Sequence, residues 1–203
     1  MPSSNPAPLS LASMSRALSV ALGERDLRTL GHSERVVKLS TELAIHLEFT
    51  EREVNQLILG AEFHDLGKIG IPDHVLHKPA AFDQNEWDCM KLHPIIGERI
   101  IRAIGCEQSA EIALIVRHHH EHFDGSGYPD KLVGTDIPVF ARIISLADCY
   151  DAVSEPRPYH KARQHSDIMD LLESESGSKH DPDLLHAFSA MIEKSTLRTP
   201  DAD

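Results

Sequence analysis

Residues 50–65 read TEREVNQLILGAEFHD, and this stretch sets the fold class of the chain. Thr50 and Glu53 form the pattern of a capping box, in which each side chain bonds the other's backbone N–H at a helix start. Apolar residues then recur at the spacing of one helix face: Val54, Leu57, Ile58 and Ala61. His64 and Asp65 lie three and four residues past the last of these, so they continue the face expected to be buried. The stretch therefore predicts a helix whose buried face ends in two polar side chains.

The same helical spacing recurs along most of the chain, without sustained strand alternation. Further helices are expected over 33–48, 84–91, from 93 onward, over 109–121, from 138 onward, and more weakly over 160–174 and 182–194. The sequence thus predicts an all-α fold of about seven or eight helices. We expect residues 1–9, rich in Pro and Ser, to be disordered, 10–195 to form one domain, and 196–203 to fray.

The bulk composition fits a single domain of 203 residues, with 41% hydrophobic and 26% charged residues. The net charge of -12 argues against binding to a nucleic-acid polymer through a basic surface. The chain has three cysteines that are far apart in sequence, which argues against a disulfide framework. The chain has no apolar run of membrane-spanning length and no basic segment typical of a signal peptide. We therefore expect a cytoplasmic protein without a membrane segment.

Polar side chains occupy buried-face positions on each of five predicted helices. The candidates are His32, His64, Asp65, His93, His119, His120 and Asp148. Any one of them alone is more often a hydrogen-bonded core residue than a ligand. Seven together are costly to bury without a common partner, because each loses its hydration. A divalent metal replaces that hydration and keeps the carboxylates ionised, so the pattern predicts a metal centre.

The ligand types narrow the choice of metal. Histidine and aspartate without a nearby thiolate disfavour a structural zinc cage and suit iron or manganese, with other divalent ions open. A carboxylate directly beside a histidine, as in His64-Asp65, is placed to bridge two ions. Two such ions are the usual device for in-line hydrolysis of a phosphoryl group, with a hydroxide between them as the nucleophile.

Five motifs, in order and with matching spacing, resemble those of HD-GYP domains, a subgroup of the HD metal-dependent phosphohydrolases. They are FHDLGKIGIPD (63–73), HP (93–94), HHEHFDGSGYPD (119–130), IPVFARIISLADCYDA (137–152) and RPYHKA (157–162). The resemblance runs from about Asp26 to Phe188. It implies an HD-domain-type helical bundle and hydrolysis of the bacterial messenger cyclic di-GMP.

The resemblance also implies roles for individual residues. The first ion would be held by His32, His64, Asp65 and Asp148, and the second by His93, His119 and His120, with Asp65 bridging the two. Lys68 would bond the nucleophile or the scissile phosphate, and Arg157 would hold a phosphate. From the residues alone, the alternative interpretations are a solvated helix-end lysine for Lys68 and a surface arginine for Arg157.

The loop Gly125–Pro129 has two interpretations. Glycines 125 and 127 permit backbone conformations closed to other residues, and Tyr128 with Pro129 would form a rigid rim. In the family this loop lies by the active site and is linked to docking of a protein partner. From sequence alone it is a tight connection. His118 and His122 lie off the buried stripe and are interpreted as incidental, with a position of His122 facing the pocket as the alternative.

The chain also departs from the family pattern. Some members hold a third metal through a glutamate four residues before the first histidine, where this chain has Arg28. Arginine cannot ligate a cation, so we expect two ions and a contact between Arg28 and a substrate phosphate. His160 stands where a basic residue is common in the family. About 25 residues precede the first motif, too few for a sensory domain, so we expect a stand-alone chain or an excised catalytic part.

The expected activity is a cyclic di-GMP phosphodiesterase that yields linear pGpG, with a second cut to GMP left open. One alternative is an HD phosphohydrolase for another cyclic dinucleotide or a nucleotide. The other is a catalytically weak receptor that binds the dinucleotide and docks a partner near Tyr128.

Overall fold

The computed structural model describes residues 11–25, 27–154 and 163–201, and the regular elements in these ranges are all helical. The α-helices are α1 (Leu11–Arg25), α2 (Leu27–His46), α3 (Glu51–Phe63), α4 (Asp73–Leu76), α5 (Gln84–Met90), α6 (His93–Ile104), α7 (Ser109–His118), α8 (Val139–Ser154), α9 (His165–Ser174) and α10 (Pro182–Ile192). Two short 3₁₀ helices, η1 (Leu66–Gly70) and η2 (Gly134–Asp136), lie between them. Apart from α4 and α5, each α-helix has ten residues or more, so the all-α prediction of about seven or eight main helices is confirmed.

The capping box predicted at Thr50 is present, and α5 begins with a second one. At the start of α3, the Thr50 N–H donates to Glu53 Oε2 (2.9 Å) and the Glu53 N–H donates to Thr50 Oγ1 (3.4 Å). At the start of α5, the Asp83 N–H donates to Glu86 Oε2 (2.8 Å), and the Glu86 N–H donates to Asp83 Oδ1 (2.9 Å). Each box satisfies backbone donors that a helix start leaves without internal partners, so these two starts are encoded locally.

Two helix bounds differ from the sequence prediction. Helix α2 begins at Leu27 rather than at residue 33, so Gly31 and His32 lie inside it. Helix α7 ends at His118 rather than at residue 121. Here the Glu121 N–H bonds the His118 carbonyl (3.0 Å), and the Tyr128 N–H bonds the His120 carbonyl (3.1 Å). The returning loop therefore takes carbonyls that a longer helix would have used internally.

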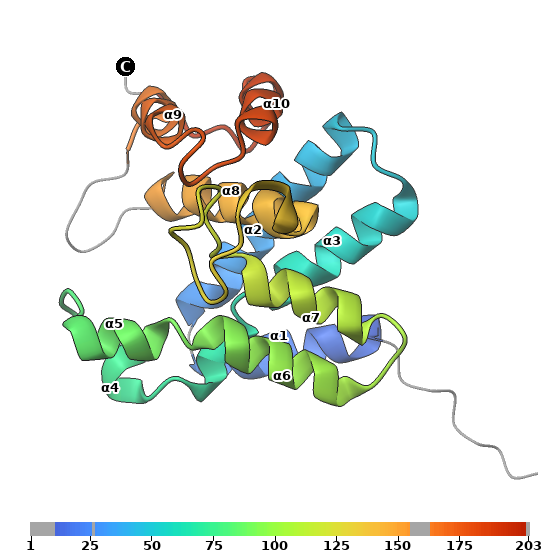
Figure 1. Ribbon diagram of the computed structural model, residues 1–203, viewed down its shortest axis with the longest axis vertical. Helices are drawn as coiled ribbons and strands as arrows, with labels where there is room; N and C mark the ends of the chain where they lie inside the picture. Colours follow the sequence, from blue (N-terminus) through green and yellow to red (C-terminus); the bar gives the residue numbers. More distant parts are fainter. Residues whose placement is uncertain (1–10, 26, 155–162, 202–203) are drawn as a thin grey trace, which may run out of the picture.

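The helices pack around α2, which contacts α1, α3, α8 and α10. Helix α6 lies along α7 and against η1, while α9 and α10 cover α8 at the opposite end of the molecule (Figure 1). One main apolar core joins these elements and buries the rings of Phe63, Tyr150 and Phe188. A smaller cluster of Ile71, Val75 and Met90 lies beneath α4 and α5.

Residues 197–199, in the tail that the sequence predicts to fray, contact the rest of the chain. Leu197 packs against the main apolar core. The Thr199 N–H donates to the Tyr150 hydroxyl (3.0 Å), and Arg198 pairs with Glu193 (3.1 Å). Helical periodicity could not predict these contacts, because they depend on the positions of Tyr150 on α8 and of Glu193 at the end of α10.

The close approach of η1 to α6 positions the polar residues that follow α3. A Cβ atom added at Gly67 would lie 1.8 Å from the His93 carbonyl oxygen and 2.6 Å from the Gly97 nitrogen. Both neighbours are backbone atoms and cannot move independently of α6. Only glycine permits this distance, so Gly67 brings the segment that carries Asp65 and Lys68 against the start of α6.

We expect Gly67→Ala to lower the free energy of unfolding by about 1–3 kcal/mol or more, because the new methyl group overlaps backbone. The matched control is Gly31→Ala inside α2, where the new Cβ would meet its nearest neighbour, Arg35 Nη1, at an ordinary 3.6 Å. That change should raise stability by roughly 0.5–1 kcal/mol, since alanine loses less entropy than glycine in a helix. Urea unfolding of the two variants measures both effects. Equal stabilities would contradict the packing argument.

Candidate metal centre

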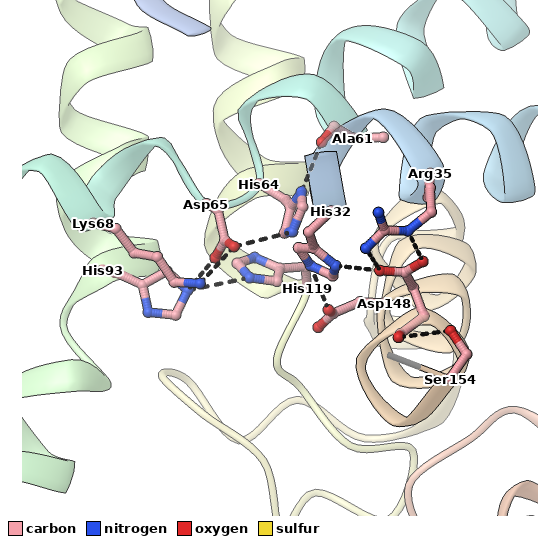
Figure 2. Close-up of polar contacts among 11 residues, drawn as sticks. His32, Arg35, Ala61, His64, Asp65, Lys68, His93, His119, Asp148 and Ser154 are labelled. Atoms are coloured by element: carbon pink, nitrogen blue, oxygen red, sulfur yellow. Dashed lines mark hydrogen bonds and ion pairs between the residues drawn. The ribbon is translucent and has the colours of Figure 1, made fainter. Parts of the chain in front are cut away.

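The structure brings together all seven polar residues that the sequence predicts as ligands. Six of them form two groups, His32 with His64 and Asp148, and His93 with His119 and His120. Within each group, one ligand atom per residue lies within 4.8 Å of the others. The first group comes from α2, the end of α3 and α8, and the second from the start of α6 and the end of α7. Figure 2 shows His32, His64, His93 and His119 converging from these separate elements.

Asp65 lies between the two groups. Its Oδ2 is 3.5 Å from His64 Nε2, and its Oδ1 is 3.4 Å from His93 Nε2 (Figure 2). The carboxylate is buried, and Lys68 Nζ donates to Oδ2 (2.6 Å). One carboxylate with an oxygen toward each histidine group is the arrangement expected of a ligand shared by two ions.

Three of the histidines are oriented by the same local hydrogen bond. His64 Nδ1 donates to the Ala61 carbonyl (2.6 Å), His93 Nδ1 to Met90 (2.8 Å) and His119 Nδ1 to Val116 (2.7 Å). In each case the acceptor lies three residues earlier. A carbonyl can only accept, so Nδ1 carries the proton and Nε2 keeps its lone pair for a ligand. Such an outer hydrogen bond is typical of histidines that bind metals.

The free lone pairs of these histidines face one another. His93 Nε2 and His119 Nε2 are 3.3 Å apart, and with Nδ1 protonated both are acceptors. His64 Nε2 is buried and has no hydrogen-bond partner among the described residues. Buried acceptors without donors are costly, and a cation between them removes the cost. The residues present therefore fit divalent metal ions.

Burial and charge set the protonation of the centre without metal. Burial lowers the pKa of His93 to about 4 and that of His120 to about 3, and it lowers the pKa of His119 as well. These imidazoles are neutral at pH 7, as metal ligation requires. Burial alone would raise the pKa of Asp65, but the positive charge of Lys68 and the neighbouring histidines outweigh it, so the pKa lies well below its usual range.

His32 differs from the other histidines because two carboxylates contact its ring. Its Nε2 is 3.0 Å from Asp148 Oδ1, and its Nδ1 donates to Asp151 Oδ2 (2.6 Å). Burial would lower the pKa of His32, but the hydrogen bonds to both aspartates dominate and raise it to about 10. Without metal, His32 is therefore an imidazolium, and an ion bound at Nε2 would replace its proton.

Asp151 is the residue that sequence reasoning missed. It is buried, and Arg35 donates to both of its oxygens, from Nε at 2.6 Å and from Nη2 at 3.1 Å. Asp151 thus fixes the His32 ring from the side opposite Asp148. The available signal was its spacing, because a residue three after Asp148 lies on the same helix face.

A second set of contacts fixes the loop after His120. Buried Glu121 accepts the N–H groups of Asp130 (2.6 Å) and Leu132 (3.2 Å). His118 Nε2 lies 2.9 Å from Asp130 Oδ2, and Arg117 donates to both Asp130 oxygens. His118 is buried, and it belongs to neither of the two ligand groups. It supports the loop rather than the metal.

The described residues include two of the side chains predicted to contact the substrate, Tyr128 and Lys68. The Tyr128 ring stacks on His120, with centroids 4.9 Å apart and an interplanar angle of 29°. Lys68 lies at the centre through its contact with Asp65. Arg157 and His160 lie outside the described residues. Arg28 falls within α2, but its side chain is outside the described part of the chain.

The comparisons with known proteins give the family. Residues 16–184 match the HD domain, and the chain belongs to the HD domain family. It is 38% identical over 175 residues to a cyclic di-GMP phosphodiesterase of Thermotoga maritima, and 34% identical over 168 residues to 3'3'-cGAMP-specific phosphodiesterase 2 of Vibrio cholerae. These matches confirm the resemblance to HD phosphohydrolases found in the motifs.

The relatives are longer proteins, and the fold is shared with solved structures. The two matches cover 85% and 83% of this chain but only 47% and 32% of the relatives. The crystal structure of a cyclic GMP-AMP-specific phosphodiesterase of V. cholerae (V-cGAP3) superposes with a TM-score of 0.68 at 19% identity, covering 92% of this chain and 50% of that one. In the described ranges, every helix is too short or too polar to cross a membrane.

We expect Asp151→Asn to lower the metal affinity of the His32 group about 10–100-fold, because the outer carboxylate that orients His32 is lost. Affinity of the His93 group should be unchanged, so a metal titration should separate into two phases. Asp170→Asn, a change at an exposed carboxylate on α9, is the matched control. Unchanged affinity at both groups in Asp151→Asn would contradict the role assigned to this residue.

Metal-free protein should be most stable near pH 6.5 and lose stability on both sides. Below pH 6.5 the unfolded chain protonates histidines whose folded pKa is about 4 for His93 and about 3 for His120, so stability falls as the pH falls toward these values. Above pH 6.5 the unfolded chain loses the proton of His32, while the folded chain keeps it because its pKa is about 10. Stability therefore falls as the pH rises toward 10. Each group contributes a slope of at most about 1.4 kcal/mol per pH unit.

Urea unfolding of chelator-treated protein across this pH range measures the effect. His93→Gln should flatten the acid side, and a change at the exposed His46 to Gln should leave it unaltered. Stability that stays constant from pH 6.5 to 4 would contradict the assignment of buried neutral imidazoles.

Proposed function

We propose that this chain is a metal-dependent phosphodiesterase that hydrolyses cyclic di-GMP to linear pGpG, with a second cut to GMP left open. The observation that carries the proposal is the single buried Asp65 carboxylate, placed between two groups of metal-binding side chains. Two ions sharing a carboxylate are a recurring solution for phosphodiester hydrolysis. The name of the Thermotoga relative supports cyclic di-GMP as the first substrate to test.

The proposed centre holds two divalent ions. The first would be bound by His32, His64, Asp65 and Asp148, and the second by His93, His119, His120 and Asp65. All these ligands are nitrogen or oxygen atoms, which supports iron or manganese. When bound, such a pair supplies Lewis-acid activation of the phosphoryl group and of the attacking water.

The chain's own side chains would orient the substrate and balance its charge. The Lys68 side chain is partly exposed and its Nζ lies 2.6 Å from Asp65 Oδ2, so its positive charge lies where a phosphoryl group would bind at the centre. Burial, helped by the charges of Asp148 and Asp65, raises the pKa of the Tyr128 hydroxyl. Tyr128 therefore stays protonated and is a hydrogen-bond donor beside His120. Phosphate contacts by Arg28 and Arg157, and docking of a protein partner at Gly125–Pro129, stay predictions.

The decisive experiment is anaerobic turnover of cyclic di-GMP by protein loaded with Fe(II) or Mn(II), with metal counted on the same sample. We expect pGpG and about two ions per chain. Asp65→Ala should lose metal and turnover together, because both groups lose their shared ligand. Wild-type activity in that variant would remove the basis of the proposal.

Lys68→Met should keep the metal and lower kcat about 100-fold, because a positive charge near the developing phosphoryl charge is lost. The matched control is Lys38→Met, a change at an exposed position of α2, which should turn over normally. An unchanged kcat in Lys68→Met would show that Lys68 has only a structural role, as the partner of Asp65.

A cyclic GMP-AMP of the 3'3' type is the second substrate to test, because the V. cholerae relative is named for it. Faster turnover of that dinucleotide would change the substrate and keep the reaction. Two bound ions without turnover of either compound would favour the receptor alternative.

A further inference from the structure

A second cluster of metal-binding side chains lies at the junction of α8 with the segment that joins α9 and α10. Cys149 follows Asp148 on α8, Glu175 caps the end of α9, and His180 lies just before α10. The backbone of this segment also holds the loop after His120, since the Phe123 N–H donates to Lys179 O (3.2 Å) and the Asp124 N–H to Ser178 O (2.8 Å). The cluster therefore joins three parts of the fold that lie apart in sequence.

The ligand atoms of this cluster are spaced as a small coordination sphere requires. One atom each of Cys149, Glu175 and His180 lies within 4.8 Å of the other two. His180 Nε2 is 3.2 Å from Glu175 Oε2, and Cys149 Sγ is 4.0 Å from the same oxygen. Neighbouring ligands of a tetrahedral zinc ion are roughly 3.3–3.5 Å apart, as follows from its bond lengths. Small side-chain rotations would close the difference.

His180 gives an independent indication of a missing ligand. Its side chain is 1% exposed, yet neither ring nitrogen makes a hydrogen bond with any described residue. The nearby Glu175 oxygen is close to Nε2 without the orientation of a hydrogen bond. A buried imidazole that is left unsatisfied costs free energy, so its position facing a thiol and a carboxylate needs a reason.

Lys179 shows that the cluster accepts a cation. Its Nζ lies 3.2 Å from Cys149 Sγ and 3.4 Å from Glu175 Oε2, contacting two of the three ligand atoms. The Lys179 side chain is 31% exposed, so its ammonium can swing into water while its stem stays in place. Glu175 is partly exposed as well, which leaves a route from solvent to the cluster.

We propose that Cys149, Glu175 and His180 form a third metal site, separate from the two-ion centre, for a borderline-soft divalent ion such as zinc. The thiolate, imidazole and carboxylate ligands suit zinc, and a water would complete four ligands. On binding, the Cys149 thiol releases its proton to solvent and Lys179 moves out. The ion would tie α8, which carries Asp148, to the segment between α9 and α10. The proposal does not rest on the reaction assigned to the two-ion centre.

Cobalt(II) is the probe that separates this site from the two-ion centre. A thiolate bound to Co(II) gives an intense charge-transfer band in the near ultraviolet, which the histidine and aspartate ligands of the other centre cannot give. We expect wild-type protein titrated with Co(II) to show the band, and added Zn(II) to remove it. Cys149→Ser should lose the band and one bound ion per chain.

Three further variants make the test specific. His180→Leu removes a buried unsatisfied group, so it should fold, and it should lose the band. Lys179→Met removes the competing ammonium and should lower the Co(II) concentration needed for half of the band. Cys106→Ser is the matched control, because the Cys106 thiol contacts Ser109 rather than a histidine, and its band should match wild type.

Either of two results would overturn the proposal. One is that wild-type protein binds Co(II) without showing a thiolate band. The cluster would then hold the Lys179 ammonium, paired with Glu175 beside the thiol, and bind no metal. The other is a band that survives in Cys149→Ser or His180→Leu.

Discussion

The buried Asp65 carboxylate is the interaction on which the rest of the site depends. It follows α3 directly, lies within 3.5 Å of a histidine nitrogen from each group, and is contacted by Lys68. A carboxylate in this position is stable only while positive charge surrounds it, because burial alone favours its neutral form. Lys68 and the His32 imidazolium supply that charge without metal, and divalent ions would supply more of it. The helices that carry the two histidine groups therefore meet at one buried carboxylate, that of Asp65.

The histidines around Asp65 are prepared for ligation by the backbone. Three of them use a carbonyl three residues earlier to fix the ring and the tautomer, and this carbonyl lies in the last turn of α3, α5 or α7. His32 lies inside α2, and its Nδ1 donates to a carboxylate, that of Asp151. It depends instead on Asp151 and Arg35, which come from α8 and α2. One ligand therefore depends on tertiary packing, while three are set locally.

The second cluster, of Cys149, Glu175 and His180, shares α8 with the two-ion centre. Asp148 and Cys149 are adjacent in sequence but differ by about 100° around the helix, so they face different neighbours. Each face meets a histidine from a distant element, His32 in one case and His180 in the other. A helix that carries ligand atoms on two faces can couple the position of one site to the occupancy of the other.

The sequence by itself determined the all-α class, the capped start of α3 and the identity of all seven ligand candidates, because helical periodicity places polar residues on faces that must be buried. The family resemblance suggested which of these candidates would bind the same ion. Their grouping in space depends on how α2, α3, α6, α7 and α8 pack together. Only the tertiary structure placed Asp65 between the groups, brought Asp151 to His32 and gathered Cys149 with His180. These contacts join residues up to 119 positions apart, and local spacing carries no information about such distances.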